Sequence, residues 1–89
     1  MNIQYPAKIT HDASDDRYLV QFYDFDEAIT EGETLEEALY NASEVLSLTI
    51  EGRFDEKMDV PKPSRHANAC MVAPAARVQA ALLIHFMKG

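Results

Sequence analysis

Hydrophobic and polar residues alternate along the first third of the chain. Apolar or aromatic residues occupy every second position from Ile3 to Ile9 and again from Tyr18 to Phe22, on either side of a polar turn. A period of two is typical of strands that bury one face, so the two runs predict an antiparallel hairpin. A third short strand is predicted at about Ala28 to Glu31.

The spacing of apolar residues changes to three and four after Gly32. Thr34 and Glu37 have the spacing of a capping box, in which each side chain bonds a free backbone N–H of the first helical turn. The helix is therefore expected to start here and to run to Arg53 or Phe54. Its apolar stripe would consist of Leu35, Ala38, Leu39, Ala42, Val45, Leu46, Thr49 and Ile50.

The last third contains a proline-bearing connector from Asp55 to Ser64, a small apolar run at residues 68–73 and a second helical pattern from Ala75 to Lys88. The apolar run predicts a returning strand. The final helix has almost no polar face, so we expect a partner chain or a missing domain to bury it. The residues expected to make these oligomer contacts are Val78, Leu82 and Phe86.

The predicted order strand–strand–strand–helix–strand (βββαβ) is an α+β arrangement, in which one helix covers one face of a mostly antiparallel sheet. We expect residues 1–73 to form this unit. Residues 74–89 would be a C-terminal helix, either the start of a missing or truncated DNA-binding domain or an oligomerisation element. A chain of 89 residues has little core, and self-association is a natural way to bury more surface.

The net charge of −7 is unevenly distributed. All 15 acidic residues lie at or before Asp59, together with four basic ones, whereas the chain from Pro61 onward has four basic residues and no acid. An acidic body repels phosphate, so we do not expect residues 1–59 to bind nucleic acid directly. It would attract a basic protein, although negative charge also serves solubility alone.

The composition argues against several kinds of site. Cys70 is the single cysteine, which fits a reducing cytoplasm, and the longest apolar run, Val78 to Met87, is too short to cross a membrane. The histidines have no metal-ligand spacing and no nearby nucleophile, so we expect no catalytic residue, metal or cofactor. They are His11, His66 and His85.

The polar turn between the first two strands allows an alternative. Asp12, Asp15 and Asp16 could hold Mg²⁺, as in a vestigial nuclease. A catalytic two-metal site needs carboxylates from separate elements, whereas these three share one tight turn. The spacing therefore favours a simple turn.

Several motifs taken together resemble the HicB antitoxins. Tyr5-Pro6-Ala7 opens the first strand, and Tyr18-Leu19-Val20-Gln21-Phe22 follows the turn. The strongest likeness lies in Asp24 to Ala38, where an acidic loop and a short strand lead into Gly-Glu-Thr-x-x-Glu-Ala. Pro61-x-Pro63-Ser64 and the last strand, which leads through Pro74 into a helix, are also similar to the family. The loop Tyr23 to Glu27 lacks the proline and glycine that are common there.

The resemblance implies a partial ribonuclease-H-like fold and a role in a type II toxin–antitoxin system. Such an antitoxin binds a HicA-type toxin, a small basic ribonuclease that cleaves mRNA, and masks its RNA-binding surface. Full-length members usually add a C-terminal domain that binds operator DNA and represses their own operon. We therefore expect a cytoplasmic homo-oligomer, a dimer or tetramer, without membrane contact and with DNA binding only through a domain absent from this chain.

The acidic loop after the second strand is the predicted toxin-binding site. It consists of Asp24, Phe25, Asp26 and Glu27. Carboxylates there would speed the encounter with a basic surface and fix its register. Phe25 would be either an anchor in a partner pocket or part of the core. A transcriptional repressor subunit and a Mg-dependent nuclease remain the alternative functions.

Overall fold

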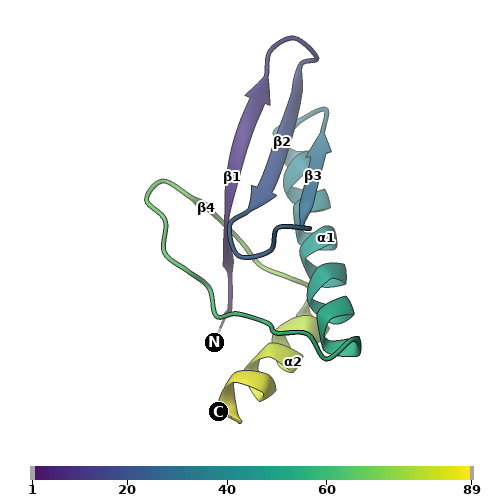
Figure 1. Ribbon diagram of the computed structural model, residues 1–89. Helices are drawn as coiled ribbons and strands as arrows, with labels where there is room; N and C mark the ends of the chain where they lie inside the picture. Colours follow the sequence, from purple (N-terminus) through teal and green to yellow (C-terminus); the bar gives the residue numbers. More distant parts are fainter. Residues whose placement is uncertain (1, 89) are drawn as a thin grey trace.

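Four antiparallel strands form a single sheet in the order β3-β2-β1-β4 (Figure 1). The structure is a computed structural model, and it describes residues 2–88. β1 (Tyr5–Asp12) and β2 (Arg17–Phe22) form the predicted hairpin, β3 (Ile29–Gly32) pairs with β2, and β4 (Cys70–Val72) returns beside β1. The α+β order predicted from the sequence is confirmed, whereas the relation to ribonuclease H stays a prediction.

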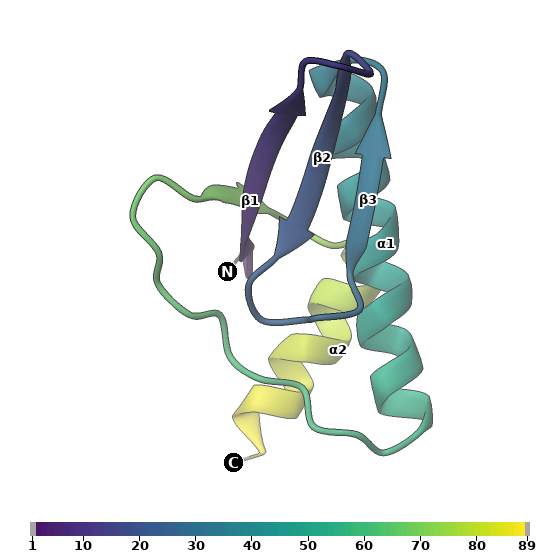
Figure 2. The ribbon, with the colours of Figure 1, turned by 45° about the horizontal axis from the view of Figure 1, so that its top comes forward.

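The helix α1 (Leu35–Asp55) covers one face of the sheet, and α2 (Ala76–Met87) packs against the lower part of α1 (Figures 1 and 2). The capping box is present: the Thr34 hydroxyl accepts a hydrogen bond from the N–H of Glu37 at 3.1 Å. The Glu37 carboxylate accepts in return from the N–H of Glu33. The apolar stripe of α1 is buried at Ala38, Ala42, Leu46 and Ile50, whereas Leu35 is exposed.

The core lies between the sheet and the two helices and includes residues that were expected at an oligomer interface. Val78 and Leu82 are fully buried in this core, so their predicted role as oligomer contacts is wrong. The second helix finds enough apolar surface within its own chain. Phe86 is only partly buried and packs on the edge of the same cluster. Neither helix within residues 2–88 is long and apolar enough to span a bilayer.

A buried serine fixes the start of α2, and the periodicity of α1 did not predict it. Ser47 accepts a hydrogen bond from the N–H of Ala75 at 2.8 Å and donates one to the carbonyl of Ser43. Ala75 is the N-cap residue of α2 and has no side chain that could cap the helix. The hydroxyl of α1 therefore satisfies a backbone N–H that would otherwise be left unpaired.

The contact between the end of β3 and the start of α1 leaves no room for a side chain at Gly32. A Cβ atom there would lie 2.8 Å from the Cα atom of Ala38, and closer still to its backbone nitrogen. By contrast, a Cβ at Gly52, in the exposed part of α1, would have no neighbour within 4 Å. The two glycines thus form a matched pair for testing how closely β3 and α1 approach.

We expect Gly32→Ala to destabilise the protein by about 1–3 kcal/mol, because the helix must move away from the sheet. Gly52→Ala should instead stabilise it by about 0.5–1 kcal/mol, because alanine loses less backbone entropy in a helix. Urea denaturation of both variants and the wild type measures the two changes. Equal stability of the two variants would contradict the close approach of β3 to α1.

Candidate protein interface

The acidic loop between β2 and β3 is built around a buried aromatic ring. Phe25 is fully buried, with its ring edge-on to that of Tyr5 at a centroid distance of 4.9 Å. The guanidinium of Arg53 lies 4.8 Å from the centre of the Phe25 ring. The prediction that Phe25 contacts a toxin is therefore wrong, because the ring belongs to the core and is inaccessible to a partner.

Glu27, in the same loop, forms a bidentate ion pair with Arg53 of α1. The two N–O distances are 2.7 and 2.8 Å, and Arg53 also donates to the carbonyl of Asp59 in the connector. Hydrogen bonding from Arg53 lowers the pKa of Glu27 from 4.5 to about 2. The pairing likewise raises the pKa of Arg53. Glu27 thus joins the loop to α1, and through Arg53 to the connector.

A second tie joins the loop to the connector. The Asp24 carboxylate accepts a hydrogen bond from the N–H of Ser64 at 3.0 Å. The Tyr5 hydroxyl donates to the carbonyl of Pro61 at 2.7 Å, and burial, with a smaller effect of the Asp24 charge, raises the pKa of Tyr5. Of the three loop carboxylates, only Asp26 makes no hydrogen bond or ion pair within residues 2–88. Two of the predicted contact residues thus hold the loop in place.

The face of β1, β2 and β3 opposite α1 is covered by neither helix (Figure 2). The register places Thr10, Leu19 and Glu31 in one row across the strands, and Lys8, Gln21 and Ile29 in the next. We call these six residues the bare face. Ile29 is 55% exposed and Leu19 is 37% exposed. Exposed sheet faces usually carry polar residues, so two large apolar residues at neighbouring positions indicate a binding surface.

The bare face ends in a group of carboxylates at the hairpin turn and the start of α1. Arg17 bridges its members, since its side chain lies 2.7 Å from Glu31 and 3.7 Å from Glu33. Within residues 2–88 the group holds seven carboxylates against the one arginine. These residues, which we call the acidic end, are Asp12, Asp15, Asp16, Glu31, Glu33, Glu36 and Glu37.

The carboxylates of the hairpin turn make local hydrogen bonds. Asp12 accepts from both the hydroxyl and the N–H of Ser14, and these bonds lower the pKa of Asp12. Asp16 lies 2.9 Å from the ring of His11. No group of three His, Cys, Asp or Glu side chains within residues 2–88 is arranged to hold a metal ion. The hydrogen bonds of the turn thus come from its own residues.

The other two histidines contact aromatic rings. His66 lies parallel to Tyr23 at a centroid distance of 3.8 Å, and His85 contacts Phe54 edge-on. Tyr23 also lines a hollow of about 310 Å³ at the end of the bare face, beside Lys8, Gln21 and Asp26. The free carboxylate of the loop therefore faces the same surface as the exposed apolar residues.

The sequence matches the family of HicB-like antitoxins of bacterial toxin–antitoxin systems over residues 4–78. The chain belongs to this family. It is 35% identical over 86 residues to Antitoxin HicB 2 of Photorhabdus laumondii, covering 97% of this chain and 60% of that protein. It is also 36% identical over 62 residues to Antitoxin HicB of Escherichia coli K12, covering 70% of this chain and 44% of that one. The HicB-like chain thus spans about half of these relatives.

A solved structure confirms the fold of the HicB-like chain. The N-terminal domain of the Burkholderia pseudomallei antitoxin HicB superposes with a TM-score of 0.66 and 20% sequence identity. The match covers 83% of this chain and 98% of that domain. Among residues 2–88, the sequence motifs had located the acidic loop but not the bare face. The sequence does contain a signal for the bare face, because Leu19 and Ile29 are apolar although they occupy the strand positions that alternate with the buried ones.

We expect the Glu27–Arg53 pair to make stability depend on pH in the acidic range. The pKa of Glu27 is depressed from 4.5 to about 2, so its contribution is complete above about pH 4.5 and is lost as the pH falls to about 2. Because the Glu27 side chain is 48% exposed, solvent screening limits that contribution to about 1 kcal/mol or less.

Glu27→Gln should therefore lower stability near pH 7 and make the acid-induced loss smaller than in the wild type. Urea denaturation between pH 7 and pH 2 measures both effects. Glu44→Gln, at an exposed position of α1, is the control for removing one charge. Parallel stability curves for Glu27→Gln and the wild type would contradict the ion pair.

Proposed function

We propose that this HicB-like chain is the toxin-binding part of an antitoxin and neutralises a small, basic, mRNA-cleaving toxin of the HicA type by masking its RNA-binding surface. The observation that carries the proposal is the bare face: an apolar patch on an uncovered sheet, bordered by the acidic end, in a chain of an antitoxin family. The chain would act by occlusion and would itself catalyse no reaction.

Electrostatics favour a partner that normally binds RNA. A ribonuclease holds the phosphate backbone with lysine and arginine, so its substrate surface is positive. The acidic end carries seven carboxylates that would attract such a surface, and Asp26 adds a free carboxylate at the other end of the bare face. Complementary charge speeds association and fixes the orientation of the two proteins.

The apolar centre of the bare face would supply binding affinity in addition to that of the charges. Protein interfaces derive much of their affinity from a few large side chains that lose water at the centre of a polar rim. Leu19 and Ile29 lie on adjacent strands and are surrounded on the bare face by polar side chains, including Thr10 and Glu31. This arrangement fits a toxin that presents an apolar patch among basic residues.

Repression of an operator, as inferred for full-length members, would depend on protein outside residues 2–88. The acidic end repels phosphate, and the bare face has one lysine and one glutamate and thus no excess of positive charge, so neither surface suits DNA. Autoregulation would then require a separate DNA-binding domain, and toxin binding would not.

We expect charge reversal at the acidic end to weaken toxin binding at least tenfold at low salt. The side chains of Asp15 and Glu36 are exposed and make no hydrogen bond or ion pair within residues 2–88, so Asp15→Lys with Glu36→Lys should leave the fold intact. Titration calorimetry against a purified toxin of the HicA type measures the affinity. Affinity of the wild type should fall with added salt.

The control for that experiment is Glu44→Lys with Glu56→Lys, which makes the same change in net charge on other parts of α1 and its C-cap. It should retain most of the affinity. Equal losses in the two double variants would mean that net charge alone matters and that the acidic end is not the contact surface. A wild-type chain that neither binds such a toxin nor rescues growth from it would overturn the proposed function.

We expect Ile29→Ala to reduce toxin affinity at least tenfold, because the side chain would be buried at the centre of the interface. Its effect on stability should be small, since the side chain is already 55% exposed in the free chain. Tyr40→Ala, at a position of α1 that is 69% exposed, is the matched control and should bind as the wild type does. Retained affinity of Ile29→Ala would exclude the bare face as the docking surface.

A further inference from the structure

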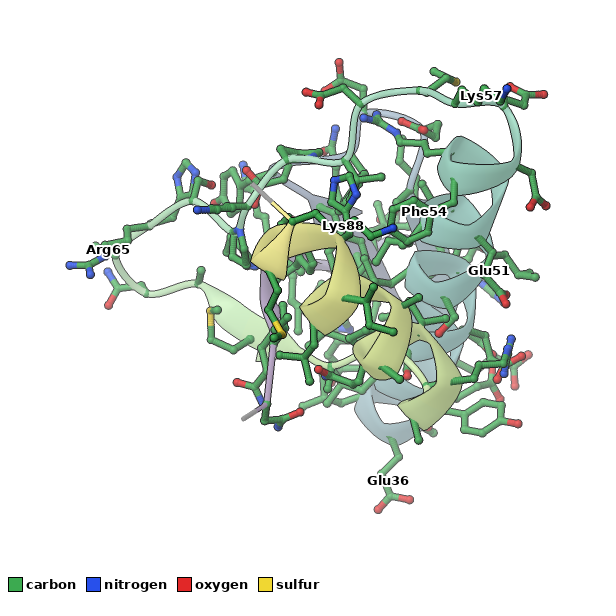
Figure 3. The ribbon with its side chains drawn as sticks, turned by 90° about the horizontal axis from the view of Figure 1, so that it is seen from below. Glu36, Glu51, Phe54, Lys57, Arg65 and Lys88 are labelled. Atoms are coloured by element: carbon green, nitrogen blue, oxygen red, sulfur yellow. The ribbon has the colours of Figure 1, made fainter. Side chains whose placement is uncertain are left out.

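A hollow of about 580 Å³ lies where the N-terminal segment (residues 2–4), the connector, β4 and α2 meet. Small-molecule sites in proteins commonly have volumes of about 300–1,000 Å³, so the hollow is large enough for one small ligand. In Figure 3, which views this end of the molecule, the chain between α1 and β4 passes beside α2, and Arg65 points away from α2. We call the hollow the α2 pocket, and its apolar lining residues are Ile3, Pro63, Met71, Leu83, Phe86 and Met87.

The walls of the α2 pocket are held in place by hydrogen bonds within the chain. Gln79 of α2 fixes the N-terminal segment, because its side-chain oxygen accepts from the N–H of Ile3 at 2.8 Å and its amide donates to the side-chain oxygen of Asn2 at 2.8 Å. The Tyr5 hydroxyl holds the connector through the carbonyl of Pro61. A pocket whose walls are already ordered loses little affinity to ordering when a ligand binds.

Lys62 is the only ionised side chain among the described residues that line the α2 pocket. Its ammonium group lies 6.0 Å from the centre of the Phe86 ring and makes no hydrogen bond or ion pair within residues 2–88. The described chain from Val60 onward has no carboxylate side chain. One free cation at the edge of an apolar hollow matches a ligand that has one negative charge and a hydrocarbon body.

A carboxylate fits the α2 pocket better than a phosphate does. Phosphate sites commonly use arginine or the N-terminus of a helix, whereas this pocket is lined by a single lysine and by the C-terminal half of α2, which disfavours a second negative charge. The side chains of Met71 and Met87 are 46% and 83% exposed. Methionine side chains are flexible and can adapt to the shape of a hydrocarbon, whose binding would remove both from water.

We propose that the α2 pocket binds a small amphipathic carboxylate of the fatty-acid type, with its hydrocarbon chain against Leu83 and Phe86 and its carboxylate beside Lys62. Such a ligand would join the N-terminal segment, the connector and α2, and would stabilise the chain as its concentration rises. This inference is independent of the proposed function, because the α2 pocket shares no residue with the bare face or the acidic end. A basic toxin would be repelled by Lys62 and is not the occupant.

Titration of the isotope-labelled full chain with decanoate, followed by NMR below the micelle concentration, tests the proposal. Decanol and decyltrimethylammonium are the neutral and cationic counterparts with the same hydrocarbon chain. Decanoate should bind about fivefold more tightly than decanol, and more tightly still than the cation, because only the carboxylate attracts Lys62. The amide signals of Ile3, Leu83 and Phe86 should shift most. Equal affinities for the three compounds, or shifts spread evenly over the chain, would overturn the proposal.

Two pairs of variants test the location of the site. Met71→Glu places a carboxylate in the α2 pocket and should weaken decanoate binding by about tenfold, because like charges repel. Met58→Glu is the matched control, since Met58 is 49% exposed and does not line the pocket, and it should bind as the wild type does. Lys62→Gln should remove the preference for decanoate over decanol, whereas Arg65→Gln, at a side chain that points away from α2, should keep it.

The outcomes separate this inference from the proposed function. Wild-type affinity for decanoate in Met71→Glu, or an equal loss of preference in the Lys62 and Arg65 variants, would overturn the ligand site while leaving toxin binding untouched. A chain that bound decanoate in the α2 pocket but bound no toxin would support the site and overturn the proposed function alone.

Discussion

The sheet is covered by a helix on one face only, and this asymmetry determines which side chains form the core and which stay exposed. Side chains alternate with a period of two along each strand, so the register that buries Val20 and Phe22 under α1 necessarily turns Leu19 and Gln21 outward. A slip by one residue would exchange the core and the bare face. The same pairing that stabilises the fold thus determines which side chains are available to a partner.

The loop between β2 and β3 shows how tertiary contacts replace local turn chemistry. It has neither proline nor glycine, yet its path is fixed by burial of Phe25, by the Glu27–Arg53 pair and by the bond from Ser64 to Asp24. These contacts join β1, α1 and the connector at one place. Asp24 and Glu27, which suggested a binding loop, therefore stabilise the fold. Most of the exposed carboxylates lie at the acidic end, at the other end of the strands.

Features set by neighbouring residues could be predicted from the sequence, and features set by distant contacts could not. Alternation and the capping box located the strands and the start of α1, because they depend on residues within one turn or one strand pair. The burial of Phe25, Val78 and Leu82 depends on residues far away in the sequence that pack against them. Composition suggested that α2 lacked a partner, but α1 and the other residues of the core cluster already bury Val78 and Leu82.

The acidic end and the bare face would contribute to binding in different ways. The acidic end holds seven carboxylates against Arg17, so its field would attract a basic protein before contact. The bare face has one lysine and one glutamate, so its charges cancel and it would contribute by burying Leu19 and Ile29 after contact. Added salt should therefore slow the encounter more than it weakens the apolar contact, because only the first step depends on unscreened charge.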